Sequence, residues 1–93
     1  MDIFKFNTSH FKGTENQETF EISVPDTVDM FSAVITKNVI TVFGMVTITP
    51  TTAKIGTVYA IKASEGLTVP DYANFLSTID NGSSVYHIFF AFN

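Results

Sequence analysis

The stretch Val-Ile-Thr-Val-Phe-Gly-Met-Val-Thr-Ile-Thr, residues 39–49, decides the fold class. Its side chains alternate with a period of two, which is the period of a strand and not of a helix. Branched aliphatic residues occupy one face, and threonines occupy the other together with Phe43 and Met45. Gly44 lacks a side chain on the aliphatic face, which indicates a β-bulge or a close backbone approach. We therefore predict a strand that presents one aliphatic face, formed by Ile40, Val42, Val46 and Ile48.

Several other segments carry the β-branched and aromatic side chains that favour strands: residues 20–24, 31–36, 55–63 and 84–92. Lys37-Asn38 separates two apolar runs, and Asn38 tolerates a positive φ, so we expect a tight hairpin there. Asp26 is expected to cap one helical turn, while residues 71–79 fit a short helix as well as a strand. The predicted class is all-β, a small antiparallel β-sandwich or barrel-like domain of about 6–8 strands with little helix.

The chain is long enough for a single domain, because it has 93 residues. We expect the antiparallel β domain to span residues 18–93, with turns at 50–52, 64–66 and 80–82. Residues 1–17 are expected to precede that domain as a short apolar hook followed by a polar loop or tether from Asn7 to Gln17.

Composition excludes several classes of partner. The net charge is −4, and the five basic residues are all lysines, whereas arginine is the usual residue for gripping phosphate and guanine, so we expect no nucleic acid. The acidic excess also argues against an anionic membrane surface. Cysteine is absent, which excludes disulfides and thiolate metal sites. Residues 1–7 have no signal-peptide pattern, and no apolar run is long enough to span a bilayer. We expect synthesis in the cytoplasm and, for any export, release by lysis or within a particle.

The sequence offers little for catalysis or metal binding. Its two histidines, His10 and His87, have no ligand spacing, and no nucleophile motif accompanies them. Asp26 and Asp29 are too few to satisfy a calcium ion, and a capped turn explains them as well. We therefore expect no enzyme activity, no metal and no cofactor.

The final predicted strand is apolar on both faces, although a sandwich buries only one face of each sheet. We expect the surplus apolar surface to lie against further copies of the chain. A trimer is favoured, with residues such as Tyr86, Phe90 or Phe92 recurring around its axis.

One short segment combines the two chemistries of a sugar site. Aromatic rings pack on the C–H groups of sugars, and carboxylate or amide groups hydrogen-bond the hydroxyls. Asp71, Tyr72 and Asn74 supply both within four residues, and His87 is a candidate neighbour from a second chain. The alternative is that Tyr72 and Phe75 are ordinary core or interface anchors.

A family resemblance extends over the second half of the chain. It rests on the residues 34–49, on Ile-Gly-Thr-Val (55–58), on Glu-Gly-Leu-Thr-Val-Pro (65–70), on Asp-Asn-Gly (80–82) and on the apolar last strand. This order resembles the β-sandwich head domains that end tail-fibre and baseplate proteins of phages infecting Gram-positive bacteria, although Ala63-Ser64 replaces the Leu-Pro that precedes the glycine there. The resemblance implies a virion component, a homotrimer or higher oligomer that binds host-surface saccharide or holds the particle together. It carries over no binding residue.

Overall fold

The computed structural model describes residues 1–64, 66 and 68–93, and within them it contains seven strands and no helix. The all-β prediction is therefore confirmed. The strands are β1 (Asp2–His10), β2 (Gln17–Pro25), β3 (Asp29–Thr36), β4 (Val39–Val46), β5 (Ala53–Lys62), β6 (Asn74–Asp80) and β7 (Val85–Phe92). The turn expected at 64–66 and the motif at 65–70 include Glu65 and Leu67, which lie outside the described residues.

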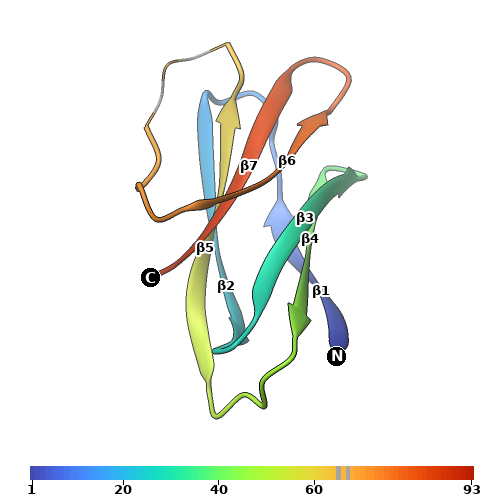
Figure 1. Ribbon diagram of the computed structural model, residues 1–93. Helices are drawn as coiled ribbons and strands as arrows, with labels where there is room; N and C mark the ends of the chain where they lie inside the picture. Colours follow the sequence, from blue (N-terminus) through green and yellow to red (C-terminus); the bar gives the residue numbers. More distant parts are fainter. Residues whose placement is uncertain (65, 67) are drawn as a thin grey trace.

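The strands form two antiparallel sheets packed face to face (Figure 1). The small sheet has the order β1-β4-β3, and the large sheet has the order β2-β5-β7-β6. Only β3–β4 and β6–β7 are hairpins between neighbouring strands, so most pairings join distant parts of the sequence. The connections β2–β3 and β4–β5 meet at one end of the sandwich, where the Asp26 carboxylate accepts hydrogen bonds from the Thr51 amide (3.1 Å) and hydroxyl (2.6 Å).

The alternation in β4 places one face in the core, as predicted, with Ile40, Val42 and Val46 buried. Ile48 is 68% exposed because the strand ends at Val46, so its expected place on that face is wrong. Gly44 lies beside a bulge, as predicted, and what approaches it most closely is a side chain and not another backbone. It lies where β3 bulges between Met30 and Ser32, and a Cβ there would come within 2.5 Å of Val28 Cγ2.

The hairpin between β3 and β4 is confirmed. Lys37 and Asn38 both have positive φ, at 51° and 63°. This pair of left-handed residues matches the right-handed twist of the strands that it joins. The helical turn expected at Asp26 is wrong, because the Val28 amide bonds the Pro25 carbonyl in a tight turn and β3 begins at Asp29. Residues 74–80, whose type was open, form an edge strand.

The polar loop expected over residues 7–17 is shorter than predicted. Strand β1 continues to His10 because it pairs with β4, a partner far away in sequence. The pairing of β1 with β4 is irregular after Asn7. There the Thr8 hydroxyl accepts a hydrogen bond from the Ile40 amide at 3.2 Å, so this amide still has a partner. The loop that follows is held by the Glu18 carboxylate, which accepts hydrogen bonds from two of its backbone amides.

The core lies between the sheets, and its largest fully buried side chains are Tyr86, Phe11 and Phe90. Phe11 comes from the segment that was expected to be a tether, yet its ring meets Tyr86 edge-on at 4.9 Å between centroids. The inward face of β7 therefore completes the core. Tyr86 and Phe90, expected around an oligomer axis, are buried in the core of the single chain, and Phe92 is partly buried against it.

Candidate functional site

Three aromatic residues form a row across the outer face of the large sheet, the face directed away from the core. Tyr59 of β5 pairs with Phe89 of β7, which pairs with Phe75 of β6. Directly paired residues of antiparallel strands point to the same side, so register alone places the three side chains in one line. We call Tyr59, Phe89 and Phe75 the aromatic row.

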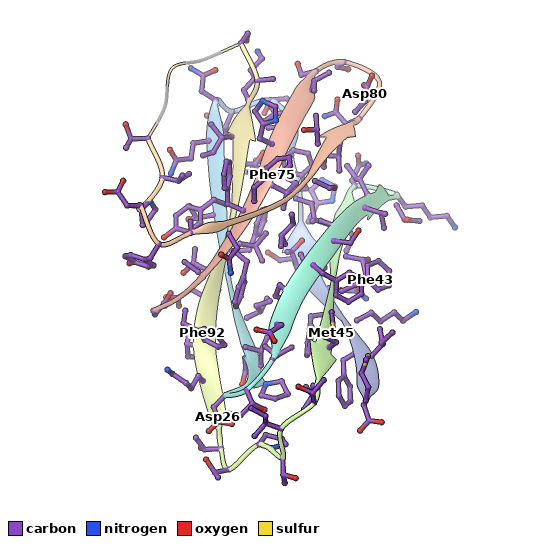
Figure 2. All side chains as sticks on the ribbon, in the orientation of Figure 1. Asp26, Phe43, Met45, Phe75, Asp80 and Phe92 are labelled. Carbon is purple, nitrogen blue, oxygen red and sulfur yellow. The ribbon has the colours of Figure 1, made fainter. Side chains whose placement is uncertain are left out.

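The row is most open at its Phe75 end. Phe75 is 57% exposed, whereas Tyr59 and Phe89 are half-buried. The Phe75 and Phe89 ring centroids are 5.5 Å apart, and the ring planes make an angle of 65°. The rings therefore form a ridge with one accessible face on Phe75, and not a flat platform. Figure 2 shows Phe75 on β6, at the edge of the large sheet.

His87 lies beside this ridge on β7. Its ring centroid is 6.0 Å from that of Phe75, and its Nδ1 shares a 2.8 Å hydrogen bond with the Thr78 hydroxyl. The register pairs His87 with Thr78 on the same outer face. Because Thr78 engages Nδ1, Nε2 is the ring nitrogen available to a ligand.

The four predicted site residues fall into two groups. Asp71 and Tyr72 occupy an exposed turn closed by the Ala73 amide and the Pro70 carbonyl (2.9 Å), and Tyr72 is 69% exposed. Asn74 begins β6 and is also exposed. His87 lies farther along the sheet, and among the described residues no hydrogen bond or ring contact joins it to Asp71, Tyr72 or Asn74.

Phe75 contacts the His87 ring and follows Asn74 in sequence, but Asn74 pairs with the core residue Phe90, so its side chain points to the opposite face of the sheet. We expected Phe75 only as a core or interface anchor, and Phe89 was not a site candidate. The alternation of residues 85–92 already placed Phe89 on the face opposite Tyr86. The pairing of Phe89 with Phe75 and Tyr59 was the information that the sequence lacked.

Electrostatics adds little to this face. The pKa of Asp26 is lowered, chiefly by the Thr51 hydroxyl, but Asp26 lies at the end of the sandwich. The pKa of Tyr86 is raised, mainly by burial and also by Glu18 and Glu15, and its hydroxyl donates to the Glu15 carbonyl at 2.8 Å. Tyr86 therefore belongs to the core and has no role in the aromatic row.

Two pockets on the surface of the described residues lie away from this row. One of about 390 Å³ lies between residues 23–25 and 50–53, and one of about 430 Å³ lies between residues 62–64 and 83–85.

No group of three or more metal-ligating side chains occurs in the described part of the chain. The same part contains no helix that is long and apolar enough to cross a membrane. The arrangement on the large sheet is suited to shallow binding at an exposed edge.

Comparisons with known proteins give no relative for this chain: no family model, no curated protein and no solved structure matches it.

Proposed function

We propose that this protein is a non-enzymatic binding module whose ligand is a saccharide, held at the Phe75 end of the aromatic row. The single observation that carries the proposal is an exposed aromatic ring with polar side chains beside it on the same face of a sheet. Phe75 offers an apolar face for sugar C–H groups. His87, hydrogen-bonded to Thr78, lies beside it on the same face, whereas Asn74 pairs with the core residue Phe90 and reaches the site only from the strand edge.

Asp71 and Tyr72 extend this proposed site. They lie in the turn that leads directly into β6, so they approach the same edge of the large sheet. Asp71 is a hydrogen-bond acceptor for hydroxyls, and Tyr72 adds a second exposed ring. The site is shallow, so it suits one or two sugar units and leaves them open to water. We therefore propose binding without catalysis.

The resemblance to phage head domains supports the choice of ligand and suggests the location. We propose a virion tail or baseplate, with a cell-surface saccharide of the host as the ligand. Each site is expected to bind weakly, on the order of 0.1–1 mM, because each exchanged hydrogen bond gains only about a kcal/mol. Linked copies would raise the avidity by about 10²–10⁴.

The test is binding to a glycan array and to purified cell-wall polysaccharide. Phe75→Ala and Tyr72→Ala should each weaken binding by about tenfold, since aromatic packing contributes about 1 kcal/mol or more. Phe4→Ala is the matched control, because Phe4 is an exposed aromatic residue on the other sheet. Equal binding by all three variants and the parent chain would refute the saccharide site.

A second candidate function is a purely structural subunit of an assembly, with no small ligand. It is favoured by the large apolar side chains exposed outside the core, including Ile3 at 63% and Phe31 at 43%. The family resemblance favours three copies. A solution mass near 10.3 kDa at high protein concentration would reject this candidate, whereas a failed glycan array would leave it standing.

A further inference from the structure

The outer face of the small sheet combines an apolar centre with two opposite charges. The bulge in β3 adds Phe31 to this face, which also carries Ser32 and Val34 of the same strand. Phe31 and Val34 are both more than 40% exposed. Phe43 and Met45 lie along the central strand β4 and are half-buried, and Ile3 lies on β1. We call these five residues, Ile3, Phe31, Val34, Phe43 and Met45, the apolar face. Figure 2 shows Phe43 on the side of the small sheet that points away from the large one.

The charges lie on the two flanking strands. Lys5 of β1 is paired with Phe43, and Asp29 of β3 is paired with Met45, so both point outward with the apolar face. Both are exposed. Strand β4 separates them by two strand spacings, about 10 Å. The face is therefore positive on one flank and negative on the other, with apolar side chains between them.

We propose that the apolar face binds a second copy of this chain around a two-fold axis that runs along β4. Such an axis places β1 of each copy over β3 of the other, so Lys5 of one copy comes near Asp29 of the second copy, twice. An axis across the strands would instead place β1 over β1 and bring the two Lys5 side chains together. The charges thus favour the axis along β4 over the axis across the strands.

This pairing rests on the self-association put forward as the second candidate function. It assigns two copies in place of the three that the resemblance favours, and it names the surface and the symmetry. It leaves the aromatic row free, because that row is on the opposite side of the sandwich. Three strands cover a strip only about 14 Å wide. The strands β3 and β4 have 8 residues each and are therefore about 26 Å long, so the strip covers less than the standard interface of about 800 Å² per partner. We therefore expect a weak, concentration-dependent dimer.

The experiment is sedimentation equilibrium on the full chain over about 10–500 µM, a range that brackets weak association. The parent chain should approach twice the 10.3 kDa mass. Lys5→Asp and Asp29→Lys should each weaken the dimer by about tenfold or more, because each places two like-charge pairs at the interface. An equimolar mixture of the two variants should dimerise again. In the mixed dimer, residue 5 of each copy faces a residue 29 of the opposite charge.

Phe43→Asp should abolish the dimer, and Phe75→Asp, a matched change on the large sheet, should leave it intact. Circular dichroism checks that each variant is folded, and the charge variants carry the test if Phe43→Asp unfolds. A parent chain that stays monomeric, a mass of three copies, or a mixture no stronger than its parts would each overturn the proposal. Saccharide binding, measured on the Lys5→Asp monomer, reports on the first candidate function separately.

Discussion

The two outer faces of the sandwich differ in a way that the alternation of their strands does not reveal. The large sheet carries an aromatic row that ends in a cluster of hydrogen-bonding groups around Phe75 and His87. The small sheet carries aliphatic and aromatic residues flanked by Lys5 and Asp29. Polar groups beside a single open ring suit a small hydroxylated ligand, whereas an apolar strip between opposite charges suits a copy of itself. The same fold thus provides two surfaces with different chemistry.

The largest expected contrast is between the core and either outer face. Phe90→Ala should lower the free energy of unfolding by about 3–5 kcal/mol, because it leaves a cavity around a fully buried ring. Phe75→Ala and Phe43→Ala should each cost less than about 1 kcal/mol, since solvent replaces most of the lost contact. Urea unfolding measures all three. A cost for Phe75→Ala equal to that of Phe90→Ala would show that the aromatic row is structural.

The next contrast is between two glycines on the inner faces of the sheets, Gly56 of the large sheet and Gly44 of the small sheet, and it compares the cost of adding a methyl group at each. In Gly56→Ala the new methyl group would overlap the Phe90 ring, and in Gly44→Ala it would press on Val28 and on the flexible end of Met30. Overpacking of this kind costs about 1–3 kcal/mol. We expect the cost of Gly56→Ala to lie at the upper end of this range, because a buried ring can move aside less than a methionine side chain can. Equal unfolding free energies for the two variants would contradict this difference between the sheets.

A smaller effect is expected where the edges of the two sheets meet. The Ser77 hydroxyl of β6 donates to the Ala33 carbonyl of β3 at 2.6 Å and so links the large sheet to the small one. Ser77→Ala should cost about 1 kcal/mol, the usual net value of one hydrogen bond. The exposed Ser83 provides the control, because its substitution by Ala removes no such link. Identical urea midpoints for the two variants would mean that this bond adds no net stability.

The smallest effect concerns the end where the β2–β3 turn meets the β4–β5 loop. The Thr51 hydroxyl and amide hold the pKa of Asp26 below its ordinary value of 3.8. A lowered folded-state pKa contributes stability that is present above 3.8 and is lost as the pH falls through the folded value. Asp26→Asn should therefore be slightly less stable than the parent near neutral pH and equal to it in strong acid. Thermal unfolding across this range checks the sign, and a gap that widens in acid would refute it.

Much of the fold was predictable because the signals that set it are local. The period of two in residues 39–46 predicts a strand and one buried face, and the Lys37-Asn38 pair predicts the hairpin through its left-handed backbone. The errors were also local in origin. Residues 7–10 are polar, and only their pairing with β4 makes them a strand. Phe11 lies in a polar stretch, and only the packing of distant rings shows that it is a core residue.

The candidate site divides in the same way. The sequence by itself determined which chemistries occur along residues 71–75 and that β7 has two apolar faces. Only the tertiary structure decided that Tyr86 and Phe90 face the core, while Phe89 joins Tyr59 and Phe75 outside it. The physical reason is that alternation defines two faces of a strand without stating which one is covered. That choice, and the line of three rings across β5, β7 and β6, comes from the register of strands that are distant in sequence.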